Sequence, residues 1–473
     1  MPSALSATFA ALAAFAAMVL LLAGCADTSM RPYAQPSVPA KAAWANSSSL
    51  PLSKADLIVP DWWREFHDPY LDGLVSRALA GNFDLAVLAA RIGVADAQIA
   101  EARAGALPTL DAGAGASFEK STGQPFVKQF NLATQTNWDI DIWGKVEKGV
   151  QAQKAEFAAT EADWRAGYLK LVADVSTTYF QILQFDEQID RQQTALANNR
   201  DILATYRAME QNGLLPHTRV LQQSAEVNRL GTDLIELQRL RALAANALAT
   251  LIGVPAGELQ VAPGHLQERV RVPTVPAGLP SQLLKRRPDV VAAEYRVLEA
   301  YDLTGQAKLA QLPSISLTGR GGTSSFALST LLKSFTFGLL PSINFPIFDP
   351  GVKAHVRTSE AQARVAEQAY RQTVMAAFED VENALVNLDA HRRQRAELQQ
   401  QVDQLRLVAT TTDAQRKEGV ASQLEVFETE RSLLGAQLAL LANQQQILSD
   451  TVTLYKALGG GWPPLEVADA ARH

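Results

Sequence analysis

Apolar residues recur along the chain at two periods, and each period predicts a different kind of element. In 145–211 and 351–417 they are spaced alternately three and four residues apart, which keeps one seam of a helix against a partner helix. A helix of roughly 67 residues spans about 100 Å, and no compact globular domain needs such a rod. Shorter helices are expected at 72–105, 217–252, 281–310 and 421–458.

Four further segments alternate with a period of two residues, which predicts β-strands at 107–118, 128–143, 313–322 and 334–348. This alternation is typical of a membrane β-barrel with lipid outside and water inside, although a soluble sandwich with one wet face would show it in a single strand. In 128–143 the apolar or β-branched face is Phe130, Leu132, Thr134, Thr136, Trp138 and Ile140, and the polar face includes Asn131, Gln135, Asn137, Asp139 and Asp141. The polar face, both aspartates included, is expected to line the water-filled side, with a place below the membrane at the junction of barrel and helices as the alternative for Asp139.

One chain supplies only four of these strands. Four strands cannot close a barrel in lipid, because open edges leave backbone groups without hydrogen-bond partners at several kcal/mol each. Several copies must therefore share one barrel. Eight, twelve and sixteen strands all satisfy this requirement.

Most of the chain consists of two copies of one plan, displaced by 205 or 206 residues. Each copy contains a helix, two strands, a very long helix and a shorter helix, so repetition defines the domains. We assign 61–253 to the first repeat, 254–286 to a linker, 287–460 to the second repeat and 461–473 to a C-terminal tail. The matched positions are Leu107-Pro108 with Leu312-Pro313, Trp164 with Tyr370, Gly213 with Gly419, Val220 with Val426, and Ile252-Gly253 with Leu458-Gly459.

The N-terminal segment 1–24 reads as a secretory signal, because it has no charged residue and a short apolar run that ends in small residues. The sequence Leu22-Ala23-Gly24-Cys25 looks like a bacterial lipobox, which makes Cys25 the mature N-terminus and the acceptor of a diacylglycerol and an N-acyl chain. An incidental or buried cysteine is the alternative. Segment 25–60, with this cysteine at its start, is rich in Pro, Ser and Ala and predicts an extended linker.

The charge balance and the motifs of the chain argue against several classes of function. The net charge is −6, from 43 basic and 49 acidic residues without a clustered basic face, which argues against a nucleic-acid partner. The six histidines lack metal-ligand spacing. Neither a nucleophile elbow nor a phosphate-binding glycine loop is present, so we expect no enzyme, no metal site and no cofactor beyond the lipid.

Three motifs carry a resemblance to a known family: Trp62-Trp63-Arg64-Glu65-Phe66-His67-Asp68, Arg287-Pro288-Asp289-Val290 and Pro346-Ile347-Phe348-Asp349-Pro350-Gly351. With the repeat and the lipobox, they make the chain similar to the TolC-like outer-membrane factor family, nearest to its NodT/OprM-like lipoprotein branch. The resemblance implies a mostly α protein with membrane β. Three copies would form a 12-stranded outer-membrane β-barrel, continuous with a long α-helical barrel that extends into the periplasm. A periplasmic adaptor (membrane fusion protein) and an inner-membrane RND-type transporter would be the partners of this lipid-anchored homotrimer.

The same resemblance places a gate where the long helices turn, at Gly213 and Gly419. It implies that Glu425 and Glu428, one helical turn apart, belong to an acidic ring at the narrow end of the pore. Arg219 stands where the family commonly has an acid, and we hypothesise that it pairs with Glu425 or Glu428 to hold the gate shut. A solvated helix face is the alternative for each of these residues.

These expectations predict the outer-membrane channel of a tripartite efflux pump, which conducts its substrates passively. A channel for type I protein secretion is one alternative, and a periplasmic coiled-coil lipoprotein without a pore is another. Drugs, organic solvents and metal ions all remain candidate substrates.

Overall fold

The computed structural model describes residues 33–39, 41, 43–45, 60–123, 125–275 and 286–461. The predicted signal peptide, Cys25, most of the linker up to residue 60 and all but the first residue of the tail lie outside these residues. Two compact units are present. The first is built from residues up to 38, from 90–161 and from 292–372, and the second from 39–89, from 162–291 and from 373 onward.

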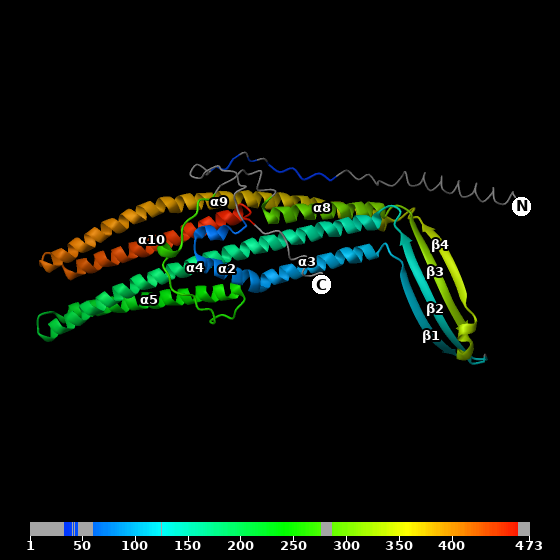
Figure 1. Cartoon of the computed structure of the whole chain (residues 1–473), viewed down its shortest axis with the longest axis horizontal. Helices are drawn as coiled ribbons and strands as arrows, with labels where there is room; N and C mark the ends of the chain where they lie inside the picture. Colours follow the sequence, from blue (N-terminus) through cyan, green and yellow to red (C-terminus); the bar gives the residue numbers. More distant parts are fainter. Residues whose placement is uncertain are drawn as a thin grey trace. The chain divides into compact units, whose positions relative to one another are not determined.

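The elements follow one another in the same order in both halves of the chain, which confirms the repeat (Figure 1). The first half contains α2 (Pro69–Gly81), α3 (Phe83–Ala104), β1 (Thr109–Glu119), β2 (Val127–Ile140), α4 (Lys145–Gln211) and α5 (His217–Ile252). The second half contains α8 (Pro288–Leu309), β3 (Ser314–Ser325), β4 (Thr336–Asn344), α9 (Pro350–Lys417) and α10 (Gln423–Ala457). Three short helices, η2 (Trp62–Phe66), α6 (Leu266–Arg269) and η3 (Leu328–Lys333), complete the described part.

The four strands form one antiparallel sheet in the order β1-β2-β3-β4 (Figure 1). The register places Leu132 between Ala114 and Thr323, and Leu317 between Trp138 and Pro341. Apolar residues of neighbouring strands therefore gather on one face of the sheet, as the alternation predicts. The opposite face carries Asp111, Asn131, Gln135, Asn137, Asp139, Ser316, Thr318, Arg320, Ser342 and Asn344.

Two strands end earlier than the sequence predicts. β2 stops at Ile140 instead of 143, so the expectation that Asp141 belongs to its polar face is wrong. The Asp141 carboxylate accepts the backbone N–H groups of Val146 (2.9 Å) and Glu147 (3.1 Å) and thus caps the start of α4. β4 stops at Asn344 instead of 348. Asp349 then caps α9 in the same way, by accepting the N–H groups of Gly351 and Val352.

The first helix of the first repeat is interrupted, so the prediction of one helix over 72–105 is wrong. Asn82 separates α2 from α3 with an extended backbone. Its side-chain oxygen accepts the N–H of Leu85 at 2.8 Å, and its side-chain nitrogen donates to the carbonyl of Leu251 at 3.0 Å. This residue caps one helix and ties the break to the end of α5. In the second repeat, α8 begins at Pro288, and 281–285 lie outside the described residues.

Aromatic packing explains the motif at 62–68. Trp62 is fully buried in the second unit and stacks on Tyr455 of α10, with ring centroids 4.9 Å apart. The ring centroids of Phe66 and of Phe180 on α4 are 5.0 Å apart. Asp68, which caps α2, also accepts the hydroxyl of Tyr179 at 2.7 Å. The motif thus joins the core of this unit.

The described part of the linker lies against α9. Trp44 is buried and packs edge-on against Phe378, with ring centroids 6.1 Å apart. Lys41 forms an ion pair with Glu382 at 2.6 Å, and the same carboxylate accepts the N–H of Ala45. These contacts fix Lys41, Trp44 and Ala45 against the second unit.

Among the described helices, no single one combines the length and apolar character of a membrane span. The bent pair α2 and α3, with 44° between them, meets that test only when the two are taken together.

Candidate functional site at the helix turns

The two turns that join the long and short helices have the same backbone geometry. At the first turn, Gly213 has a φ of 71° and donates to the carbonyl of Glu210, while Leu214 donates to that of Met209. At the second, Gly419 has a φ of 79° and donates to Arg416, while Val420 donates to Gln415. This is the pattern of a Schellman motif, which needs a left-handed residue at the end of a helix. Both predicted glycines therefore lie at the turns.

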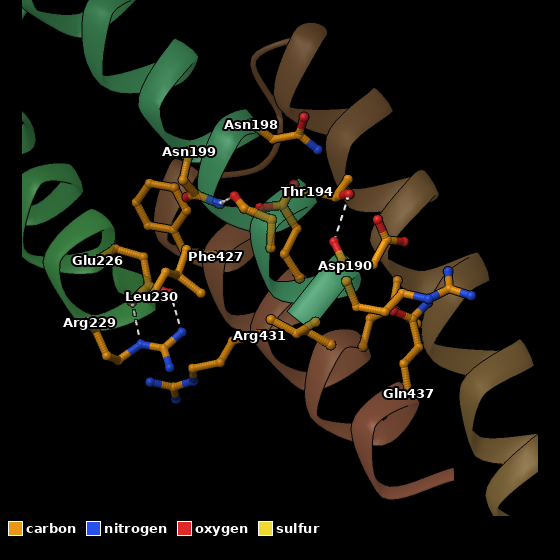
Figure 2. Close-up of a pocket in the computed structure, with 15 residues that line it drawn as sticks. Asp190, Thr194, Asn198, Asn199, Glu226, Arg229, Leu230, Phe427, Arg431 and Gln437 are labelled. Atoms are coloured by element: carbon orange, nitrogen blue, oxygen red, sulfur yellow. Dashed lines mark hydrogen bonds and ion pairs between the residues drawn. The ribbon is translucent and has the colours of Figure 1, made fainter. Parts of the chain in front are cut away.

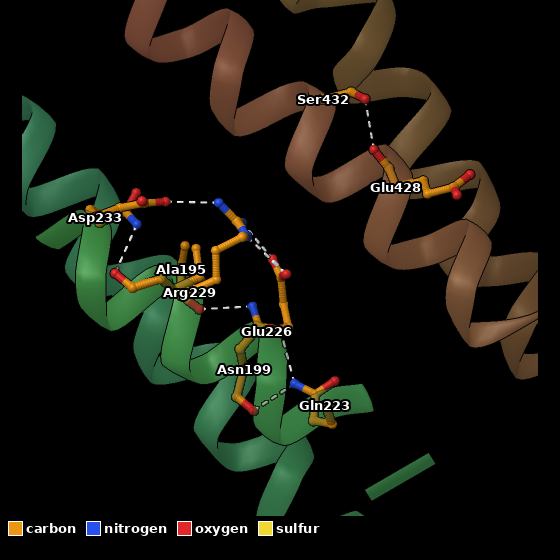
Figure 3. A network of polar contacts seen from close by, with 10 residues as sticks. Ala195, Asn199, Gln223, Glu226, Arg229, Asp233, Glu428 and Ser432 are labelled. Atoms are coloured by element: carbon orange, nitrogen blue, oxygen red, sulfur yellow. Dashed lines mark hydrogen bonds and ion pairs between the residues drawn. The ribbon is translucent and has the colours of Figure 1, made fainter. Parts of the chain in front are cut away.

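The two predicted gate glutamates have different local roles. Glu425 forms a capping box at the start of α10, in which its carboxylate accepts the N–H of Ser422 at 2.8 Å and the Ser422 hydroxyl accepts the N–H of Glu425. Glu428 is exposed, and its backbone carbonyl accepts a hydrogen bond from the hydroxyl of Ser432 at 2.7 Å (Figure 3). Of the two carboxylates, that of Glu425 has a structural duty, and that of Glu428 is presented to solvent.

Arg219 is half-buried in the first turn of α5. Burial raises the pKa of Tyr206, and the cationic groups of Arg416 and Arg219 oppose this rise, so both arginines lie near that tyrosine. Within the described part of one protomer, we find no ion pair between Arg219 and Glu425 or Glu428. The hypothesised pair is therefore not formed inside a single chain.

A cavity of about 340 Å³ opens between α4, α5 and α10 in the second unit (Figure 2). Its walls carry three acidic and three basic side chains, together with an apolar strip. The charged residues are Asp190, Arg191, Glu226, Arg229, Glu430 and Arg431, and the strip consists of Leu230, Phe427, Leu433 and Leu434.

Arg229 organises the polar network beside this cavity (Figure 3). Its guanidinium donates to Glu226 at 2.9 and 2.5 Å and to Asp233 at 2.8 Å. The hydrogen bond with Glu226 raises the pKa of Arg229 further. Six residues before Arg229, the buried Gln223 donates to the backbone and side-chain oxygens of Asn199 on α4, at 2.8 and 3.0 Å. The Gln223 bonds hold α5 to α4, whereas the Arg229 bonds lie within α5 and leave Glu226 and Arg229 in the cavity wall.

Two polar contacts farther along the helices were not predicted from the sequence. Arg241 of α5 pairs with the buried Asp186 of α4 and donates to the carbonyl of Val261 at 3.0 Å. His391 of α9 contacts the buried Asp450 of α10 at 2.5 Å. A charged residue inside an apolar helical seam is the signal that could have identified both pairs. Each pair joins the long helix of a repeat to the short one.

In the part of the chain that the structure describes, no cluster of three or more His, Cys, Asp or Glu side chains has the arrangement of a metal site.

Comparisons with known proteins point to one family. The model of the family "Outer membrane efflux protein" matches 74–254 and 279–460. The chain is 31% identical over 433 residues to the pyoverdine export outer membrane protein OpmQ of Pseudomonas putida, covering 88% of this chain and 92% of that protein. It is 29% identical to the cation efflux system protein CusC of Escherichia coli, covering 94% and 97%. The fold is similar to that of the Neisseria gonorrhoeae MtrE outer membrane channel in its open state. The TM-score is 0.82 at 31% identity, over 92% of this chain and 98% of that one.

Proposed function

Because the chain belongs to the outer membrane efflux protein family and acts as the outer-membrane channel of an efflux pump, we propose that its turns at Gly213 and Gly419 form the periplasmic gate. The chain works with a periplasmic adaptor and an inner-membrane transporter. The gate would then be the place where the adaptor acts.

The two open edges of the sheet support the proposal that several copies share one channel. β1 and β4 are the outer strands of the four-stranded sheet. In lipid their free backbone groups need partners, and strands of neighbouring copies supply them. Three copies, the number that the family implies, give a barrel of twelve strands. Its apolar face meets lipid, and its polar face, with Asn137, Thr318 and Arg320, lines a water-filled duct.

Transport through this duct is passive. Its walls need only hold water and dissolved substrate, while the inner-membrane transporter supplies the energy. The relatives include a pyoverdine exporter and a cation efflux protein, together with a solvent efflux protein of Pseudomonas putida at 29% identity. Such a range supports a channel that selects little by itself and leaves selection to the transporter.

We place the charged part of the gate at Arg219 and Glu428. Arg219 lacks an ion pair with either glutamate in the described protomer, and Glu428 is exposed, which supports a pair formed between copies. Three such pairs would hold the helix ends together. The additional carboxylates of Glu425, near the same turns, would make the constriction favour cations.

Single-channel recording in planar bilayers tests this gate. Arg219→Ala removes the cation and is expected to raise the conductance of the purified assembly severalfold. Arg207→Ala, an exposed arginine on α4, serves as the matched control and should conduct like the wild type. Equal conductance for the wild type and Arg219→Ala would exclude the pair as a latch.

The lipid anchor at Cys25 is part of the same proposal. The lipobox supports it, and so does similarity to the probable outer membrane lipoprotein SilC of Salmonella typhimurium, which is 28% identical over 94% of this chain and 97% of that protein. The mature chain is expected to incorporate radioactive palmitate, and Cys25→Ala should abolish the incorporation. Unchanged labelling of Cys25→Ala would place the lipid elsewhere.

A further inference from the structure

The loop between β3 and β4 carries an unusually apolar surface. It contains η3 and begins and ends with a phenylalanine. Four large side chains are exposed by 67 to 81%: Phe326, Leu328, Leu332 and Phe335, which we call the rim patch. A loop that simply faces water would not gather so many apolar side chains. The rim patch therefore indicates an apolar partner.

Hydrogen bonds show which face of the sheet η3 covers. The Thr323 hydroxyl donates to the carbonyl of Leu331, and the hydroxyls of Ser325 and Thr330 lie 2.5 Å apart. The register pairs Thr323 with Leu132, and Ser325 with Phe130. These hydroxyls consequently project from the apolar face, and η3 lies on that side, where it buries Thr323.

The ring of Phe335 supports the same placement. A Cβ added to Gly321 would lie 3.2 Å from the Cζ of Phe335, so this ring packs directly over the glycine. Gly321 pairs with Phe337 of β4, again on the apolar face. The hydroxyls of Thr323 and Ser325 thus point toward η3, and Phe335 touches the sheet through the tip of its ring, while Phe326, Leu328 and Leu332 remain exposed.

The charge within the loop itself is positive, and the neighbouring hairpin carries charges of both signs, Glu119 and Lys128 among them. Between Phe326 and Phe335 the only ionisable side chain is that of Lys333, at the end of η3. On the neighbouring hairpin, the ammonium of Lys128 lies 5.8 Å from the ring centroid of Phe126, which stacks on Phe118. Aromatic rings next to lysines are typical of a membrane–water interface, where the ring stays in the apolar layer and the ammonium reaches the phosphates.

We propose that the rim patch is a lipid-binding surface that inserts into the outer leaflet, with Lys333 and Lys128 on the phosphates of its lipids. The inference rests on the proposed placement of the sheet in the outer membrane. A neighbouring copy does not compete for the patch, because copies join at the edge strands β1 and β4, whereas η3 packs on β3 and β2 in the middle of the sheet. The patch anchors the extracellular end of each copy from outside the barrel.

Fluorescence in vesicles tests the insertion. With Cys25 acylated, Leu332→Cys introduces the one free thiol of the chain, which can carry an environment-sensitive dye. The full-length assembly is reconstituted into phosphatidylethanolamine and phosphatidylglycerol vesicles with lipid A, with and without doxyl-labelled lipid. We expect quenching by the doxyl lipid and at least fivefold weaker quenching by iodide than for Ser324→Cys, which labels the polar face at the same level.

Leu132→Cys separates failure of this inference from failure of the membrane placement. Leu132 lies on the apolar face opposite Thr323. If iodide reaches Leu332→Cys but not Leu132→Cys, the sheet is in lipid and the inference about the patch is wrong. If iodide reaches both, the membrane placement itself fails, and the inference fails with it.

A second measurement addresses the lysine. Lipid A is expected to raise the thermal dissociation midpoint of the wild-type assembly, and Lys333→Glu should lose at least half of that shift. Lys333→Arg, which keeps the charge, should retain it. An equal shift for Lys333→Glu and the wild type would exclude a phosphate contact at this residue.

Discussion

Gly253 lies so close to the backbone of Gly81 that no side chain fits between them. A Cβ built on Gly253 would be 1.9 Å from the carbonyl oxygen of Gly81, and its φ of 81° is left-handed. The second repeat has the same arrangement: Gly459 has a φ of 87°, and a Cβ there would be 3.0 Å from the carbonyl carbon of Arg286. In both repeats, a glycine after the short helix is thus fitted against the chain near the start of the repeat.

Gly253→Ala should therefore destabilise the assembly. Left-handed backbone alone costs a residue with a Cβ about 1–2 kcal/mol, and the contact with Gly81 requires the chain to move as well. Gly459→Ala should cost less, because its contact is longer. The thermal dissociation midpoint of the purified assembly measures both effects.

Gly73→Ala is the matched control. Nothing lies within 4 Å of a Cβ at this position in α2, and alanine is roughly 1 kcal/mol more favourable than glycine inside a helix. Its midpoint should equal or exceed that of the wild type. If Gly253→Ala has the same dissociation midpoint as Gly73→Ala, the close approach of Gly253 to Gly81 does not contribute to stability.

Arg241 should be essential to the packing of α5 on α4. Arg241→Ala leaves the Asp186 carboxylate, whose side chain is 6% exposed, without its cation. Loss of one partner of a buried pair typically costs about 3–5 kcal/mol. Arg239→Ala, two residues earlier, breaks an exposed pair with Glu236 and should change little. Limited proteolysis in 162–252 reports the difference, and equal cleavage of the two variants would contradict it.

Glu299 should make stability depend on pH. Burial and, after it, the neighbouring Glu156 together raise the pKa of this carboxyl to about 7, against an opposing effect of Arg296. In the unfolded chain the value is near 4.5. Between these values the folded state holds the additional proton, so stability falls as the pH rises through that window.

The dissociation midpoint should accordingly be higher at pH 5 than at pH 8, by the equivalent of about 1–3 kcal/mol per protomer. Glu299→Gln is neutral at both values and should raise the midpoint at pH 8 and reduce the dependence. Glu101→Gln, an exposed residue of α3, controls for the loss of a surface charge. If Glu299→Gln keeps the full wild-type dependence, another group causes it.

The two gate glutamates should respond differently to removal of their charge. Glu428→Gln is expected to lower the cation preference of the channel, because its exposed carboxylate has no helix-capping duty. Glu425→Gln should weaken the start of α10, at a cost of about 1 kcal/mol as for other caps, with a smaller change in selectivity. Reversal potentials in a salt gradient measure the preference. A larger shift for Glu425→Gln would reverse the assignment.

The long helices were predictable because their signals are local. α4 and α5 have the predicted bounds, since heptad spacing and the glycine after each helix lie in the sequence itself. The capping box at Ser422 and Glu425 is equally local in the sequence, although the sequence analysis predicted only a pore-lining or solvated role for Glu425.

Other features depend on contacts between distant residues. The break at Asn82 is fixed by a bond to Leu251, and Arg241 finds Asp186 only once α5 lies on α4. The placement of η3 on the apolar face likewise follows from the β2–β3 register. No pattern within a single segment carries this information.

Ion conduction with engineered cysteines tests most directly whether the assembled chains enclose a water-filled channel. Thr318 lies on the polar face of β3, and Leu317 beside it lies on the apolar face. In planar bilayers, both Thr318→Cys and Leu317→Cys should give discrete conductance steps. A charged, water-soluble thiol reagent should reduce the current through Thr318→Cys and leave Leu317→Cys unchanged. Membrane-inserted assemblies without conductance steps, or a block of Leu317→Cys but not of Thr318→Cys, would contradict the channel.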